Sequence, residues 1–130
     1  MKKMIVATAL LLAVIGAGIF ETVTAWRYFT QTGDRLDVVM TELSTREEDE
    51  VSDFAASELT AIIEDWQGRE DLFYIIYDNR ALSDFYERSS TAKRYVLRGN
   101  NTDALAELEC ALFRVRSLAR DALPLPLNFL

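Results

Sequence analysis

Apolar residues follow two different patterns along this chain. Residues 4–20, "MIVATALLLAVIGAGIF", form one block without a charged side chain. From residue 36 onward, apolar side chains recur at steps of three, four and seven, the spacing of one face of a helix. The first pattern is typical of a segment that enters a membrane, and the second of helices that pack together. The chain therefore divides at about residue 30.

The N-terminal block has the features of a membrane anchor. Its 17 residues span about 25 Å as a helix, near the thickness of about 30 Å of a bilayer's hydrocarbon core, and "ETVTAW" would complete the span. Trp26 follows at the position where aromatic side chains gather at a membrane surface. Lys2 and Lys3 before the block predict a cytoplasmic N-terminus. We therefore expect residues 1–30 to form a single-pass anchor in the cell membrane, with residues 31–130 outside.

A cleaved signal peptide is the alternative interpretation of the same residues. The lysines and the apolar block fit it, and "VTA", ending at Ala25, has small residues at the two positions that signal peptidase recognises. Cleavage there would release a secreted, soluble helical domain. The aromatic residues after the block favour the anchor.

Small residues recur within the block. Ala9, Ala13 and Ala17 are spaced by four residues, which lets two membrane helices approach closely. The simpler interpretation is that alanine is common in apolar helices. "LAVIGAGIFE" also resembles the start of a dinucleotide-binding loop, but Glu21 stands where the third glycine is needed, and its carboxylate would repel a pyrophosphate. We therefore reject a nucleotide site.

The remaining residues predict an all-α fold, in which the transmembrane or signal-anchor helix is followed by an antiparallel three-helix bundle with one long helix. A kink is expected at Thr32-Gly33-Asp34, before helically spaced apolar residues up to Leu43. The long helix begins at Thr45, because Thr45 and Glu48 have the spacing of a capping box, and it continues to residue 76. The next helix ends at Gly99, and the last covers residues 104–123.

The predicted core positions follow from the helical spacing. They are Leu36, Val39, Met40 and Leu43 before the long helix; Val51, Phe54, Ala55, Leu59, Ile62, Ile63, Trp66, Phe73 and Ile76 within it; Leu82, Phe85, Tyr86, Ser89, Ala92 and Val96 in the next helix; and Leu105, Leu108, Leu112, Val115, Leu118 and Ala119 in the last. Trp66 is the largest of them, and its indole N–H requires a hydrogen-bond partner at the edge of the core.

Composition supports helices and opposes one class of partner. Five glycines and two prolines are few, which favours long helices over strands and turns. A net charge of −7 opposes nucleic acid binding, because phosphates require a basic surface. Residues 34–71 contain 13 acidic and three basic side chains, whereas residues 72–130 contain seven and eight. We expect an acidic helix beside basic neighbours, with an acidic interaction tail as the alternative.

The densest acidic run is Glu47, Glu48, Asp49 and Glu50. At the start of a helix these charges would be stabilised by the helix dipole. A calcium site needs oxygen ligands around a glycine turn, whereas consecutive helical positions point in different directions. The run is therefore predicted to be a solvated helix start and, if a partner binds, a contact surface for a basic protein.

Few side chains are suited to catalysis. The chain has no histidine and one cysteine, so the commonest general base and metal ligand are absent. Cys110 falls nearly opposite the apolar stripe of its helix, and the neighbouring Glu107 and Glu109 oppose a reactive thiolate. An intermolecular disulfide is the alternative. We expect no catalytic residue, no cofactor and no metal, and a non-enzymatic role.

With these helices laid out, the chain resembles the family called domain of unknown function 4363, found mostly in Firmicutes. The shared features are Lys2-Lys3 before one apolar segment, a long helix centred on Trp66, "DNRALSDF", "LRGNNTDALAELE" and a terminal "LPLNFL". Members often have a histidine after the long helix, where this chain has Asp78-Asn79. The resemblance implies a small membrane-anchored helical protein and lends no catalytic residue.

The sequence thus predicts a membrane-anchored extracytoplasmic protein that contacts lipid through its N-terminal helix and binds an unidentified protein. One alternative is the secreted domain. The other is a structural subunit of a surface or secretion apparatus, although "KKM" lacks the glycine that pilin-like processing requires. The uncharged tail "LPLPLNFL" cannot continue a helix, because its prolines lack donors. It is expected to fold back over the helices, with a partner-binding strap as the alternative.

Overall fold

The computed structural model describes residues 1–122, apart from the side chain of Ile76. Four α-helices and no strand occur in this part of the chain. They are α1 (Lys2–Ser44), α2 (Asp53–Ile76), α3 (Asn79–Leu97) and α4 (Asn101–Asp121). The all-α prediction is confirmed. The expectation that the C-terminal tail folds back concerns residues outside the described range.

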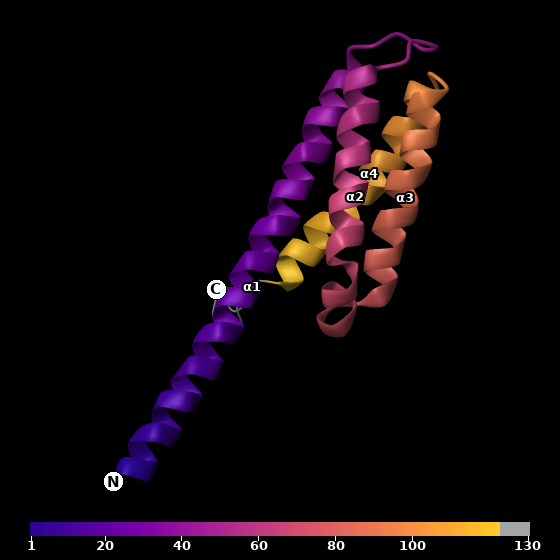
Figure 1. Ribbon diagram of the computed structural model, residues 1–130. Helices are drawn as coiled ribbons and strands as arrows, with labels where there is room; N and C mark the ends of the chain where they lie inside the picture. Colours follow the sequence, from indigo (N-terminus) through magenta and orange to yellow (C-terminus); the bar gives the residue numbers. More distant parts are fainter. Residues whose placement is uncertain (123–130) are drawn as a thin grey trace.

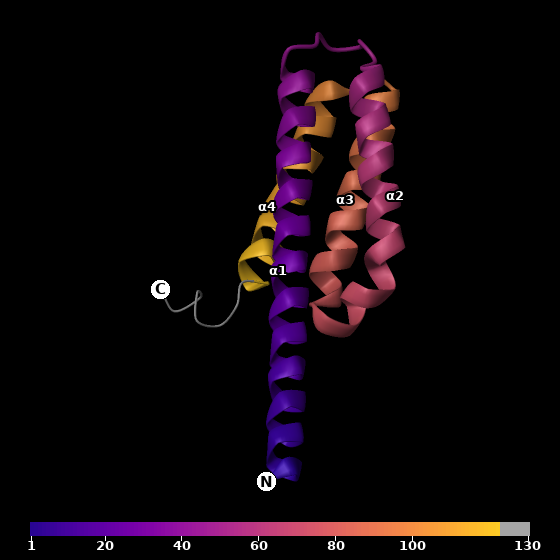
Figure 2. The same cartoon turned by 60° about the vertical axis from the view of Figure 1, so that its left-hand side comes forward.

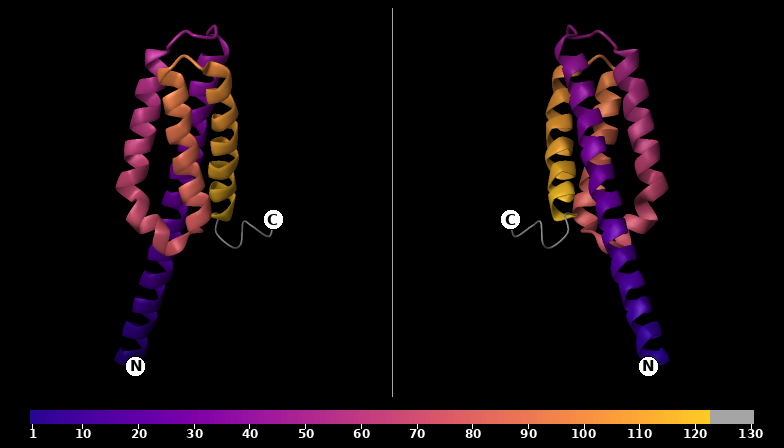
Figure 3. Two further views of the ribbon diagram at one scale, coloured as in Figure 1. Left: turned by 90° about the vertical axis from the view of Figure 1, so that its right-hand side faces the viewer. Right: turned by 90° about the vertical axis from the view of Figure 1, so that its left-hand side faces the viewer.

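The helices form an antiparallel four-helix bundle. Each helix packs against the next in sequence, and α4 returns to pack along α1, which closes the bundle (Figures 1 and 3). The sequence predicted a bundle of three helices, whereas the structure has four in residues 1–122. The second half of α1 supplies the fourth helix, so the boundary expected between residues 30 and 31 falls inside a continuous helix.

The kink predicted at Thr32-Gly33-Asp34 is wrong, because α1 remains helical throughout. Gly33 serves a close contact instead of a bend. A Cβ atom at this position would lie only 3.0 Å from Cζ of Arg116 on α4. The Arg116 guanidinium lies across α1 and pairs with Asp34 at 3.2 Å and with Asp37 at 2.9 Å. The predicted proximity of acidic and basic segments is realised at this contact.

An aromatic cluster fills the half of the bundle nearest to the protruding part of α1. The ring centroid of Phe29 lies 4.9 Å from that of Phe73 and 5.7 Å from that of Trp66, and Trp66 lies 4.1 Å from Phe85. Burying each of these side chains contributes about 2–3 kcal/mol, and the tilted ring contacts add to it. Trp66 is fully buried as predicted, but its indole N–H has no acceptor within residues 1–122, contrary to the expected partner.

The core positions predicted in the later helices are largely confirmed. Of the predicted set, the structure buries Leu36, Val39, Leu43, Ala55, Leu59, Ile62, Trp66, Phe73, Leu82, Phe85, Ser89, Ala92, Val96, Leu108, Val115, Leu118 and Ala119. Val51 and Phe54 are wrong, since they are 45% and 47% exposed. Ala104 and Ala111 are buried although the sequence analysis did not select them, because alanine lets α4 approach its neighbours closely.

The ends of the helices correct one capping prediction and confirm another. Thr45 terminates α1 and does not begin a helix, so the predicted capping box is wrong. Ser52 is the N-cap of α2, and its hydroxyl accepts a hydrogen bond from the Ala55 N–H at 3.1 Å. Gly99 ends α3 as predicted, with a positive φ of 76° that favours glycine.

Candidate functional site

The first part of α1 is an apolar rod that residues 1–122 leave exposed. Residues up to about 20 protrude beyond the bundle as a continuation of the helix (Figures 1 and 2). Ala9, Ala13 and Ala17 all lie in this exposed part, and every large apolar side chain between Met4 and Phe20 is exposed as well. By length and composition, α1 could cross a membrane, and none of its apolar window is buried in the bundle.

The protruding part meets the bundle between Phe20 and Ala25. Phe20 is 72% exposed, whereas Ala25 is buried. Trp26, predicted to lie at a membrane surface, is half-buried and packs against the hydrophobic core. The residue therefore lies at the base of the bundle, one turn or two beyond the end of the apolar block.

A groove of about 360 Å³ separates the emerging α1 from the end of α2. Its lining consists of Gly18, Phe20, Glu21, Thr22, Thr24 and Ala25 on α1, and Arg69, Leu72, Phe73 and Tyr77 on or just after α2. Burial raises the pKa of the Tyr77 phenol, and the negative charge of Glu21 raises it further. We call this part of the molecule the basal groove.

Beside the basal groove, a cation lies over an aromatic ring. The Arg69 guanidinium carbon is 4.3 Å from the centroid of the Tyr28 ring, within the range of a cation–π contact. Burial raises the pKa of the Tyr28 phenol, with a further contribution from the charge of Asp65. This contact joins the base of α1 to α2.

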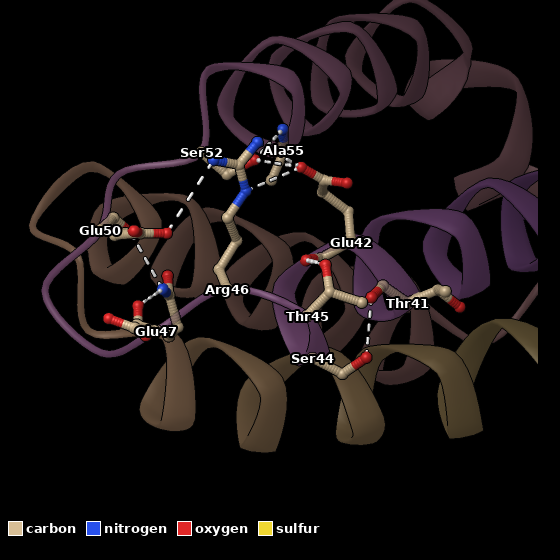
Figure 4. Close-up of polar contacts among 10 residues, drawn as sticks. Thr41, Glu42, Ser44, Thr45, Arg46, Glu47, Glu50, Ser52 and Ala55 are labelled. Carbon is tan, nitrogen blue, oxygen red and sulfur yellow. Dashed lines mark hydrogen bonds and ion pairs between the residues drawn. The ribbon is translucent and has the colours of Figure 1, made fainter.

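The predicted partner surface, Glu47 to Glu50, lies in the loop between α1 and α2 and not on a helix, at the end of the bundle opposite to the protruding rod (Figure 1). All four side chains are exposed. Arg46 pairs with Glu42 at 2.8 Å and with Glu50 at 4.0 Å (Figure 4). The acidic loop is therefore a solvated surface, although its position differs from the predicted helix start.

The backbone of the acidic loop is tied to the turn between α3 and α4. The Asn101 amide donates to the carbonyls of Glu47 and Glu50, at 2.9 Å each. The Asp49 N–H donates to the Gly99 carbonyl at 2.9 Å, and Asp49 has a positive φ of 72°. The Glu48 carboxylate accepts from the Thr102 hydroxyl at 2.5 Å. These bonds hold the backbone of the loop and the Glu48 carboxylate against the turn between α3 and α4.

A second and larger groove, of about 750 Å³, runs between α2 and α3. It is lined by Thr60, Ile63, Glu64, Gln67, Tyr86, Glu87, Ser90, Thr91, Lys93, Arg94 and Leu97. Its charged side chains are of both signs, Glu64 and Glu87 with Lys93 and Arg94.

Within residues 1–122, no group of three or more His, Cys, Asp or Glu side chains could hold a metal ion. Cys110 is exposed on α4, on the side opposite the apolar stripe. The exposure of Leu72 and Ile75 near the end of α2 was not predicted. The available signal was that neither residue belongs to the apolar stripe of its helix.

Comparison of the chain with protein-family models, with curated proteins and with solved structures gave no match. The resemblance to domain of unknown function 4363 therefore stays a prediction.

Proposed function

We propose that the protein is a single-pass membrane protein with a cytoplasmic N-terminus, and that it presents a non-enzymatic four-helix bundle outside the membrane as a module that binds another protein. The observation that carries the proposal is the continuity of α1. One helix contains both the unburied apolar rod and a quarter of the bundle, so no flexible linker separates them. Such a helix couples the bundle mechanically to the bilayer.

The energetics of the rod favour a membrane over water. Its side chains include three consecutive leucines, Leu10 to Leu12, and none of them has a protein neighbour to cover it. Transfer of large apolar side chains from water to lipid contributes about 1.5–3 kcal/mol each. A soluble protein would gain nothing from leaving this surface exposed.

Cleavage after Ala25 is the alternative, because the signal-peptidase motif "VTA" is a feature of the sequence that the fold does not test. Two facts favour retention. Ala25 packs in the core, and cleavage would leave the first buried aromatic residues, Tyr28 and Phe29, within one turn of a frayed helix end. A released bundle would start at Trp26, and sequencing the mature N-terminus identifies it.

The sole cysteine provides a topology test that needs no new residue. Cys110 is exposed on the bundle, so a membrane-impermeant maleimide should label the full chain in right-side-out vesicles and leave it unlabelled in sealed inverted vesicles. Labelling only in inverted vesicles would place the bundle in the cytoplasm and contradict the proposal.

The anchor itself is tested by one charge in each half of α1. Leu12→Arg should shift the protein from the membrane to the soluble fraction, because an arginine near the centre of a spanning helix costs about 2.5–3.5 kcal/mol. Val38→Arg is the matched control, since Val38 is exposed on the half of α1 that lies in the bundle. Both variants fractionating alike would refute the anchor.

The acidic loop is the proposed contact surface, because its four exposed acidic side chains on a hydrogen-bonded backbone suit a basic partner. Glu47→Lys with Glu50→Lys should abolish crosslinking to that partner in cells, while the backbone carbonyls that hold the loop are retained. Glu109→Lys, an exposed charge change on α4, is the control. An unchanged crosslinking pattern in the loop variant would mean that the partner contacts another surface.

A further inference from the structure

The end of α2 carries two large apolar side chains in an unusual position. Leu72 is 59% exposed and Ile75 is 82% exposed, the largest fraction for any big apolar side chain of the bundle. They point away from the core that their neighbour Phe73 enters. Large apolar side chains of α2 are thus exposed at its end, as Phe54 is at its start, whereas Leu59, Ile62 and Trp66 between them are buried.

The basal groove fixes the height of these residues along α1. Leu72 and Tyr77 line it together with Gly18, Phe20 and Thr22. The end of α2 therefore lies beside the last turn of the apolar block. Figures 1 and 2 show the α2–α3 turn at the end of the bundle from which the rod emerges.

This register locates the α2–α3 turn relative to a bilayer. If residues 4–20 occupy the hydrocarbon core, the membrane surface lies near Phe20 and Glu21, and hence level with Leu72. Phe20 is exposed beside the groove, so the apolar surface of the rod continues onto the end of α2.

We propose that the α2–α3 end of the bundle inserts Leu72 and Ile75 into the lipid surface beside the anchor. The proposal rests on the anchoring role above and extends it, because the membrane contact then involves two separate segments of the chain. The charges next to these residues in sequence are of both signs, with Arg69 and Arg80 against Glu70, Asp71 and Asp78. The surface therefore suits the apolar interfacial region of a bilayer and does not select a headgroup by its charge.

Two other exposed apolar residues provide the contrast. Phe54 begins α2 and Leu97 ends α3, so both lie at the far end of the bundle, about 30 Å from Ile75 along α2. A bilayer that reaches Ile75 does not reach either of them.

The test measures the surroundings of a nitroxide label on the full chain in phosphatidylcholine–phosphatidylglycerol vesicles. Cys110→Ser removes the native thiol, and single cysteines are then introduced as Ile75→Cys, Leu72→Cys, Leu97→Cys and Leu12→Cys. Collisions with oxygen report lipid, and collisions with a water-soluble nickel chelate report water. Circular dichroism of each labelled chain verifies its helix content.

We expect labels at positions 75 and 72 to collide readily with oxygen and rarely with nickel, as at position 12. The label at position 97 should show the reverse, with a ratio of oxygen to nickel accessibility several-fold lower.

Each other outcome is informative. Nickel-accessible labels at 75 and 72 with a lipid-like label at 12 would overturn this inference and leave the anchor intact. Low accessibility to both reagents at 75 would mean that protein covers the site, either a second copy or another segment of this chain, and would also overturn it. A nickel-accessible label at 12 would refute the anchor itself.

Discussion

The two halves of α1 share one backbone and differ in everything that surrounds it. Residues up to Phe20 are exposed in the part of the chain that the structure describes, whereas Phe29, Leu36, Val39 and Leu43 are almost completely buried against α2 and α4. The halves differ in apolar content, because 14 of the 17 residues from 4 to 20 are apolar and only 10 of the 24 from 21 to 44. They also differ in arrangement, because the first half is apolar on all sides and the second on one face. A helix that is apolar all round needs a surrounding apolar medium, and a helix with one apolar stripe needs other helices.

The largest difference between the two halves is expected when one phenylalanine in each is truncated. Phe29→Ala should lower the free energy of unfolding by about 3–5 kcal/mol, because it removes a fully buried ring from the aromatic cluster. Phe20→Ala should change it by less than about 0.5 kcal/mol. Guanidinium unfolding of the full chain in mild detergent, followed by circular dichroism, measures both. Equal losses would mean that the bundle extends down to Phe20.

Replacing a glycine in each half should give a smaller difference in the free energy of unfolding. In an Arg116→Ala background, Gly33→Ala should raise the free energy of unfolding by about 1 kcal/mol through helix propensity. With Arg116 present the gain should be smaller, because the new methyl group displaces a guanidinium whose exposed ion pairs contribute up to about 1 kcal/mol.

Gly18→Ala is the matched control for this cycle, since a Cβ there meets nothing within 4 Å. Its effect should be the same in both backgrounds. Four unfolding curves for each glycine complete the measurement, and additive effects at Gly33 would show that Arg116 does not constrain it.

The smallest expected contrast is in pH dependence. Burial raises the pKa of Tyr28 above the value of about 10 for the unfolded side chain, so the unfolded chain loses this proton first. The stability of the bundle should be fully present below about pH 10 and fall as the pH rises through the folded-state pKa. The rod contains no tyrosine and should not respond. Unfolding curves between about pH 9 and pH 11 test this, and Tyr28→Phe should reduce the loss.

The helical class and much of the core could be predicted from local sequence. The stripe from Leu82 to Val96 and the stop at Gly99 were correct, because periodicity and a positive-φ glycine are local signals. The same periodicity places Cys110 nearly opposite the apolar stripe, and only the structure shows that it is exposed.

Several errors depend on contacts between residues distant in sequence. Asp49 adopts its positive φ while hydrogen-bonded to Gly99, and Asn101 fixes the same loop, so the acidic run forms a loop where its own residues favour a helix start. A kink was predicted at Gly33 from the local sequence alone. The contact of Gly33 with Arg116 on α4, which accounts for the glycine, is not evident from local sequence. The basal groove was not predicted for the same reason, since it joins residues about 50 positions apart.

The absence of a linker in α1 also sets a distance. From Phe20 to Ser44 the helix rises about 36 Å, and the acidic loop lies at the end of that rise. If the protein is anchored as proposed, this continuous helix sets the distance of the loop from the bilayer. A partner that meets it must present its basic surface at that height, and inserting or deleting whole turns of α1 near the membrane would change which partners can reach it.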